Sequence, residues 1–295
     1  MFDSKIFFHL IDPTKNIIVA YSGGGDSTAL LNYCYELKQE NHLKGSLSAI
    51  HVNHSISPHA DSWVMHCKKF CSERDIPLIC ESIKVDGKKS GLEAADRQGR
   101  YEEFKQKISS SDELLLAHHA DDVAETLMFR LFRGTGIDGL SGQIKSRKLG
   151  EGILLRPWLD YSKSILISYL VDRKLNYIED ESNASNNQDR NYIRNEILPL
   201  VSKRWPNANS QIQQTSSIIA QHLDVHEKLI YAQFPDTLFE PSLCIKSIES
   251  LDEGTRNEVI RYWIKNNNVA VPNKKILQEI TKAFIHAQPS TKTLV

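Results

Sequence analysis

Short apolar runs recur along the first half of the chain, and segments of helical length and pattern separate them. The runs are IIVAY at 17–21, LSAIHVN at 47–53, PLICESI at 77–83, LLLAH at 114–118 and ILLR at 153–156. Strands that alternate with helices predict a parallel sheet covered by helices on both faces. We therefore predict an α/β fold with a five-stranded parallel sheet, whose ligands bind beyond the carboxyl ends of the strands.

The pattern changes after the last predicted strand. Residues 183–196 are polar and lack periodicity, which favours an ordered functional loop or a connector. Residues 208–233 carry isoleucine and leucine at helical spacing, and the spans 251–267 and 273–287 predict two more helices. We predict a sheet domain at 1–214 and a small helical domain at 215–295.

The composition is that of an ordinary soluble protein with a core. The 295 residues suffice for about two domains, and 40% of them are apolar. Charged residues such as Asp3 and Lys5 interrupt the N-terminal segment, which therefore has no apolar run of signal-peptide or membrane length, and a cytoplasmic location is expected. The five cysteines form no CxxC pair, which favours reduced core thiols over a metal or redox role.

The charge balance excludes a global attraction to nucleic acid. Net charge is −1, with 36 basic residues against 37 acidic ones, so a polyanionic partner would need a local patch. The span 130–156 is such a patch, because six arginines and lysines there face only Asp138 and Glu151. A solvated surface is the alternative interpretation.

The loop after the first predicted strand, SGGGDS at 22–27, has the chemistry of a phosphate site. Its glycines allow close approach of the backbone to a ligand, and a helix predicted to begin near Ser27 offers unpaired N–H groups and its dipole. The GxxxxGK[ST] pattern is absent, so no lysine neutralises the phosphates. A Mg²⁺ ion bridging Asp26 to the phosphates would do so. The alternative is a glycine turn in which Asp26 caps the helix.

Two further segments carry candidate functional side chains. In LEAADRQGRYEEF, Glu93, Arg97 and Arg100 or Tyr101 share one helix face, where arginine could grip phosphate; a surface ion-pair ladder is the alternative.

The stretch LLLAHHADDVAET at 114–126 places His118, His119, Asp121 and Asp122 at the end of a predicted strand. Glu125 follows Asp122 by three residues, so both carboxylates share a helix face. Such a pair could bind an ammonium group or a metal, and we favour an amine or Mg²⁺ over zinc because no cysteine or third separated ligand is apparent.

These pieces, in this order, resemble the tRNA(Ile)-lysidine synthetase family of the PP-loop ATP pyrophosphatases. The matching segments are SGGGDS, HVNH at 51–54, EAADRQGRY, HHADDVAET, GTGIDGLSG at 134–142, RPWL and the segment DESNASNNQDRNYIRNE. The chain departs from the family pattern at Asp96, where a small residue is usual, and in SISPHAD after HVNH. The resemblance implies a PP-loop catalytic domain at 1–214 and a tRNA-binding helical domain at 215–295.

The resemblance also implies a two-step reaction. ATP adenylates the oxygen at the 2-position of the wobble cytidine of a tRNA(Ile) whose anticodon is CAU, and pyrophosphate leaves. The ε-amine of free lysine then attacks that carbon, and AMP leaves. The implied partners are this tRNA and L-lysine, with ATP as co-substrate and Mg²⁺ as metal, and a homodimer is compatible with the family.

The resemblance assigns the phosphate-handling residues as follows. Asp26 would hold Mg²⁺, Arg97 or Arg100 would neutralise developing phosphate charge, and His118 would contact the adenylate or the cytosine. The pyrophosphate would be cradled by the rest of the loop, which is Ser22, Gly23, Gly24, Gly25 and Ser27.

The remaining assignments concern lysine and RNA. Asp122 and Glu125 would receive the lysine ammonium group. The 134–142 loop and the nearby basic run would face the anticodon loop. The target base or the lysine carboxylate would lie near Arg190, Asn191 and Arg194.

Two rival functions remain open. Cytidine thiolation by another PP-loop enzyme would use paired cysteines, which the missing CxxC disfavours. A nucleotide-binding sensor would not need HHADDVAET or DRNYIRN. Because long family members continue into a further domain and this chain ends in β-prone TKTLV, a fragment is favoured over a short-form enzyme.

Overall fold

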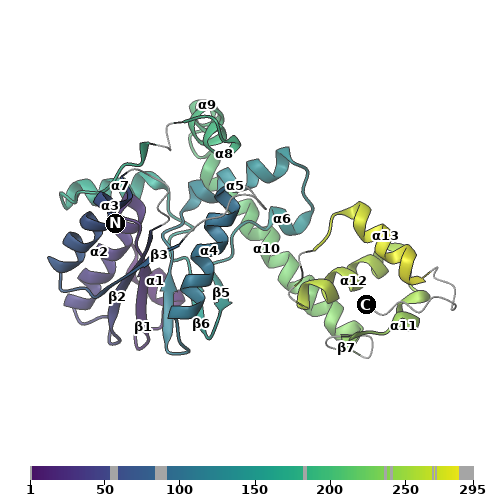
Figure 1. Ribbon diagram of the computed structural model, residues 1–295. Coiled ribbons are helices and arrows are strands. Elements are labelled where there is room, and N and C mark those ends of the chain that lie inside the picture. The colour runs from purple at the N-terminus through teal and green to yellow at the C-terminus, as the bar shows by residue number, and fades with distance from the viewer. Residues whose placement is uncertain are drawn as a thin grey trace. The chain divides into compact units, whose positions relative to one another are not determined.

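The computed structural model describes residues 2–53, 59–83, 92–181, 185–235, 238–239, 242–267, 269 and 271–285 (Figure 1). His54, Ser182, Asn183 and the C-terminal residues 286–295 lie outside this part of the chain. Within it, no helix is both long and apolar enough to cross a membrane.

The chain divides into two compact units. The first comprises residues 1–129 and 143–214, and the second comprises residues 130–142 and 215–295. The segment 130–142 therefore groups with the second unit, although the predicted boundary assigned it to the sheet domain.

The first unit is built on a six-stranded sheet. Its strands are β1 (Asn16–Ala20), β2 (Leu47–Asn53), β3 (Leu78–Ser82), β4 (Asp112–Leu115), β5 (Ser146–Leu149) and β6 (Gly152–Leu155). They lie in the order β3-β2-β1-β4-β6-β5, with β5 antiparallel to β6 and the other pairs parallel. The predicted five-stranded parallel sheet thus lacked one strand. The missing strand, SRKL, lies at the edge and buries only its leucine, so it has no apolar run to detect.

Helices connect the strands and complete both units. In the first unit they are α1 (Ser4–Leu10), α2 (Gly25–Gln39), α3 (Ala60–Ser72), α4 (Leu92–Lys107), α7 (Lys163–Asp172), α8 (Asp189–Tyr192), the π-helix η2 (Ile193–Ile197) and α9 (Leu198–Arg204). Two helices have residues in both units, namely α5 (Ala120–Phe132) and α10 (Ala208–Gln233). The second unit also contains α6 (Ile137–Leu140), β7 (Leu238–Phe239), β8 (Ser242–Leu243), α11 (Ile245–Glu249), α12 (Glu253–Asn266) and α13 (Lys274–Ile285).

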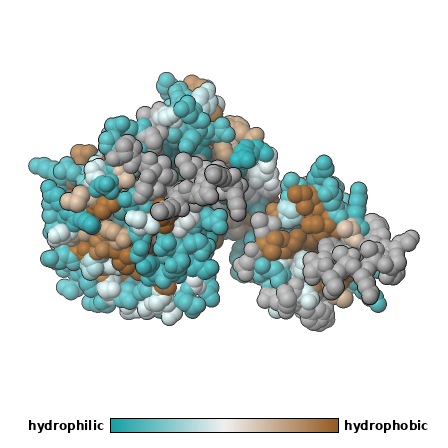
Figure 2. Space-filling view, in the orientation of Figure 1, coloured by the Kyte–Doolittle hydropathy of each residue, from teal (hydrophilic) through white to brown (hydrophobic). Residues whose placement is uncertain are grey.

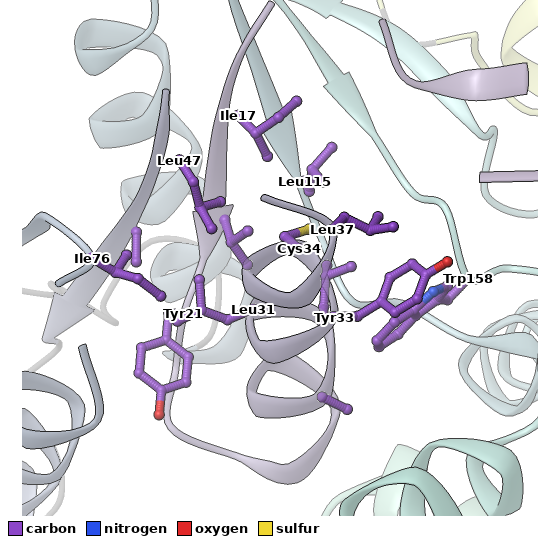
Figure 3. Close-up of a cluster of buried hydrophobic side chains, with 14 of the residues drawn as sticks. Ile17, Tyr21, Leu31, Tyr33, Cys34, Leu37, Leu47, Ile76, Leu115 and Trp158 are labelled. Carbon is purple, nitrogen blue, oxygen red and sulfur yellow. The ribbon is translucent and has the colours of Figure 1, made fainter. Parts of the chain in front are cut away.

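The central strands are buried on both faces, which explains their continuous apolar sequences. Ile17 and Val19 of β1 pack into one core cluster with α2, α3 and α7, whereas Ile18 packs into a second cluster with α4. Figure 3 shows the first cluster, in which Leu31 and Cys34 of α2 lie against the sheet. Helices therefore cover both faces, as predicted, and α4 lies on the face opposite α3.

The second unit has a core of its own. Residues of α10, α11, α12 and α13 form a separate cluster that includes Ile230, Ile248 and Val259. The 134–142 loop is tied into this unit, because Asp138 forms ion pairs with Arg261 and Lys265 of α12.

All five cysteines are free thiols. Cys34, Cys67 and Cys71 are buried, as predicted, whereas Cys80 is exposed and Cys244 is partly exposed. Burial raises the pKa of both Cys67 and Cys71 to about 12, so these thiols stay protonated at neutral pH.

Hydrophilic residues predominate on the face of the first unit shown in Figure 2, and apolar residues are scattered among them. Such scattered apolar residues are normal for a protein surface.

Candidate functional site

The glycine loop joins the end of β1 to the first turn of α2, and several hydrogen bonds hold its shape. Gly23 has a φ of 85°, and its carbonyl accepts the Ile178 N–H at 2.9 Å. The Ser22 N–H donates to Ser27 Oγ at 3.2 Å, and Ser27 Oγ donates to the Gly24 carbonyl at 3.0 Å. The loop is therefore a fixed turn.

The helix begins two residues earlier than predicted. Gly24 is the N-cap of α2, and no side chain caps this end. Asp26 thus lies in the first turn, which excludes its interpretation as the helix cap. Uncapped N–H groups and the helix dipole at this end favour a bound anion.

Asp26 is linked to the strand-end histidines through His119. Asp26 Oδ2 lies 3.5 Å from His119 Nε2, which also lies 3.5 Å from Asp122 Oδ2. Although burial opposes its charge, the carboxylates of Asp122, Asp26 and Asp121 raise the pKa of His119. Burial raises the pKa of Asp26, but the hydrogen bond and charge of His119 outweigh it, so this pKa is lowered overall.

The other oxygen of Asp26 has chemistry that suits a cation. Asp26 Oδ1 is buried and has no hydrogen-bond partner among the described residues. Within the same residues, no group of three or more His, Cys, Asp and Glu side chains could hold a metal ion. A divalent ion here would therefore need further ligands such as water and phosphate oxygens, which is the usual arrangement for Mg²⁺.

A pair of carboxylates, the buried Glu125 and the partly exposed Asp122, lies on α5 beside His119, and an arginine from a distant segment contacts it. Arg194 Nε and Nη2 lie 2.7 Å and 2.6 Å from Glu125 Oε2, and Arg194 Nη2 lies 4.0 Å from Asp122 Oδ1. Burial raises the pKa of both carboxylates, and the charge of Arg194 offsets part of this rise. The structure thus brings together Asp122, Glu125 and Arg194.

Arg190 and Asn191, the other two residues predicted near the target base or the lysine carboxylate, make different contacts. The Arg190 guanidinium lies over the Phe129 ring, 5.1 Å from its centroid, and its charge also acts on Glu125. Asn191 Nδ2 donates to the Ser185 carbonyl at 2.8 Å. Arg190 therefore acts electrostatically on Glu125, while the described bond of Asn191 is local.

His118 is held by a buried arginine that the sequence did not identify as a site residue. Arg156 Nε donates to His118 Nδ1 at 3.0 Å, and Arg156 also donates to the Ile144 carbonyl and to Tyr101 Oη. A guanidinium can only donate, so Nδ1 must be the acceptor and the neutral ring carries its proton on Nε2. Burial, followed by the charge of Arg156, holds the pKa of His118 well below its ordinary value.

The two arginines predicted on α4 lie within electrostatic reach of His118. The charges of Arg97 and Arg100 both contribute to its lowered pKa, after burial and Arg156. The Arg97 guanidinium also lies 5.3 Å from the centroid of the Tyr101 ring. Both arginines therefore contribute positive charge near His118.

Two central residues, His119 and Arg156, were absent from the predicted catalytic set. The histidine doublet was a usable signal, because neighbouring residues at a strand end point to opposite sides. His118 accordingly meets Arg156, whereas His119 meets Asp26. For Arg156, the signal was a charge directly after the buried run ILL.

Comparison with known proteins places this chain in a family. Residues 3–201 match the PP-loop domain family. A tRNA(Ile)-lysidine synthase of Serratia proteamaculans is 35% identical over 90% of this chain and 61% of its own length. One from Photorhabdus laumondii is 31% identical over 97% of this chain and 67% of its own length. The chain thus spans about three fifths to two thirds of these relatives.

A solved structure shares the fold. The U34-tRNA thiolase NcsA from Methanococcus maripaludis, solved with its 4Fe-4S cluster, superposes with a TM-score of 0.60 at 18% identity. The match covers 74% of this chain and 77% of the thiolase. At this identity the likeness concerns the fold alone.

Proposed function

The chain belongs to the PP-loop domain family and, within it, to the tRNA(Ile)-lysidine synthase family, and on this premise we propose that it forms lysidine. The substrate would be the wobble cytidine of tRNA(Ile) with a CAU anticodon, and the other reactants would be ATP and L-lysine. The observation that carries the proposal is the connection of a phosphate loop to a carboxylate pair. Asp26 on the loop meets His119, and His119 meets Asp122.

In the first step, the cytidine O2 attacks the α-phosphorus of ATP, and the bond to the β-phosphate breaks. The turn at Ser22–Gly25 and the N-terminus of α2 would hold the departing pyrophosphate. Asp26 Oδ1, buried and without a described partner, would bind Mg²⁺ together with the phosphates. When bound, this ion would neutralise phosphate charge that no loop lysine neutralises.

His118 would serve the same step as a neutral donor. Its Nδ1 accepts from Arg156, so Nε2–H is available to an oxygen of the substrate. Because its pKa is lowered, His118 would not become a cation at neutral pH. Arg97 and Arg100 would supply the positive charge as the phosphate group reacts.

In the second step, the lysine amine attacks C2 of the adenylated base, the C–O bond to AMP breaks, and the amine loses a proton. Lysine arrives as an ammonium ion, so a base must first accept a proton. Asp122 and Glu125 would bind the ammonium group. Asp122 has a raised pKa, which also suits it to accept the proton.

The test is incorporation of labelled lysine into a CAU-anticodon tRNA transcript in the presence of ATP. A transcript shown to be active with a known lysidine synthase is the control, and no incorporation by this chain into that transcript would refute the proposal. Asp26→Asn should abolish tRNA-dependent ATP–pyrophosphate exchange while the far-ultraviolet circular dichroism stays unchanged. Near-normal exchange by the folded variant would remove the metal role of Asp26.

A further inference from the structure

A basic cavity lies on the α4 face of the first unit, beside the predicted site. Its volume is about 470 Å³, and α4 and the β5–β6 hairpin supply its walls. The lining residues are Arg97, Gln98, Tyr101, Glu102, Lys105, Arg147, Lys148, Leu149 and Gly150.

Among the residues that the structure describes, the lining of this cavity has more cations than carboxylates. Arg97, Lys105, Arg147 and Lys148 line it, and Glu102 is the single carboxylate among the lining residues. None of these four cations forms an ion pair with a carboxylate of the described residues. Lysines just outside the lining do so, as in the pair Lys107–Glu81. The cavity therefore presents uncompensated positive charge, which favours an anionic ligand.

The arginines of the cavity are held in place before any ligand binds. The Tyr101 ring lies 5.3 Å from the Arg97 guanidinium and 4.6 Å from that of Arg147, measured to the ring centroid. Tyr101 Oη accepts a hydrogen bond from Arg156 Nη2 at 3.1 Å. Ordering side chains in advance lowers the entropic cost of binding. Although burial raises the pKa of Tyr101, the three arginines lower it overall, which is consistent with a positive local potential.

One residue connects the cavity to the candidate functional site. Arg156 bonds Tyr101 on the cavity wall and His118 in the site. From Arg97 to Lys105 the cations span eight residues of helix, or about 12 Å at 1.5 Å per residue. That length exceeds one phosphate group and suits a chain of phosphates.

We propose that this cavity binds the phosphate backbone of the RNA substrate next to the nucleotide that is modified. The inference rests on the proposed function for the identity of the RNA. The arginine guanidinium groups and the lysine ammonium groups would contact consecutive phosphodiesters. These contacts would position the RNA strand without any base-specific recognition.

The test measures RNA binding as a function of salt. The probe is a transcript of the CAU anticodon stem-loop, titrated by fluorescence anisotropy without ATP or lysine. The variant Lys105→Gln/Lys148→Gln removes two cavity charges, and the control Lys68→Gln/Lys69→Gln removes two exposed charges from α3 on the opposite sheet face. Thermal melting verifies that both variants fold.

We expect the cavity variant to bind with a shallower log–log salt dependence. With about 0.7 released ions per single-strand phosphate contact, two lost contacts reduce the slope by about 1.4, or about 25-fold in affinity at 0.1 M relative to 1 M salt. The control should keep the wild-type slope. An unchanged slope in the cavity variant, or an equal loss in the control, would overturn the inference.

The outcome separates this inference from the proposed function. If the wild-type chain forms lysidine but the cavity variant binds RNA like wild type, the cavity inference is wrong and the function stands. If the wild-type chain forms no lysidine while the cavity variant alone loses salt-dependent binding, the function is wrong and the RNA-backbone site stands.

Discussion

The glycine loop offers a prediction whose magnitude follows from geometry. Gly23 has a φ of 85°, and a Cβ built there would lie 2.5 Å from Ile178 Cδ1 and 3.0 Å from Cys67 Sγ. A left-handed backbone costs an alanine about 1–2 kcal/mol, and overpacking costs about 1–3 kcal/mol more. Gly23→Ala should therefore lower the free energy of unfolding by about 2–5 kcal/mol.

The neighbouring glycine is a matched control. Gly24 has a φ of −69°, and a Cβ there would meet Ser22 Oγ at 3.4 Å, an ordinary contact. Alanine is a poorer N-cap than glycine, but it also restricts the unfolded chain, and the two effects partly cancel. Gly24→Ala should change the free energy of unfolding by about 1 kcal/mol or less.

Urea denaturation followed by circular dichroism and tryptophan fluorescence compares the two variants. We expect a clearly lower midpoint for Gly23→Ala and a nearly unchanged midpoint for Gly24→Ala. Equal midpoints would refute the reasoning, because they would show that neither the positive φ nor the crowding against Ile178 constrains the loop.

Two further predictions concern titrating groups. Arg156→Met removes the donor to His118 Nδ1 and a nearby positive charge, so the pKa of His118 should rise toward its ordinary value; an unchanged histidine titration by NMR would contradict this. Burial raises the pKa of Glu113 from 4.5 to about 7 in the folded state. The folded state therefore binds this proton more tightly, and the associated stability is lost as pH rises from 4.5 through 7. Glu113→Gln keeps an acceptor for the Asp12 N–H, so it should match wild type at pH 4.5 and exceed it at pH 8 by up to about 3 kcal/mol. Unfolding curves at the two pH values that show the same difference would contradict this prediction.

The fold could be predicted wherever burial imposes a sequence pattern. β1 lies between two helical layers, so Ile17, Ile18 and Val19 are apolar and buried on both faces, and the sequence shows them as an apolar run. The edge strand β5 has one buried residue and is otherwise polar, so periodicity could not reveal it. The segment 130–142 groups with the second unit, and its ion pair with α12 joins residues more than a hundred positions apart, so no local pattern indicates it.

The sequence could predict only those features of the site that are formed by residues close together along the chain. The glycine turn and the Asp122–Glu125 pair are local features, because three or four residues define each of them. The contact of Arg194 with Glu125 joins residues 69 positions apart, and no spacing rule gives such a pair. His118 and His119 likewise make different contacts, because packing sets the directions of their side chains.

The charges around His119 indicate which carboxylate would bind the ammonium group of the lysine substrate. Four carboxylates lie around His119 and Arg194, namely Asp26, Asp121, Asp122 and Glu125. His119 and Arg194 themselves are two cations, of which His119 is charged only when protonated. Arg194 already makes two close contacts with Glu125 but lies 4.0 Å from Asp122. An entering ammonium would therefore gain most at Asp122, because Arg194 contacts it less closely, while burial, followed by the charge of Asp26, raises its pKa. Binding at Glu125 would first require Arg194 to move, so we infer that Asp122 is the primary ammonium ligand and that Arg194 stays paired with Glu125 beside it.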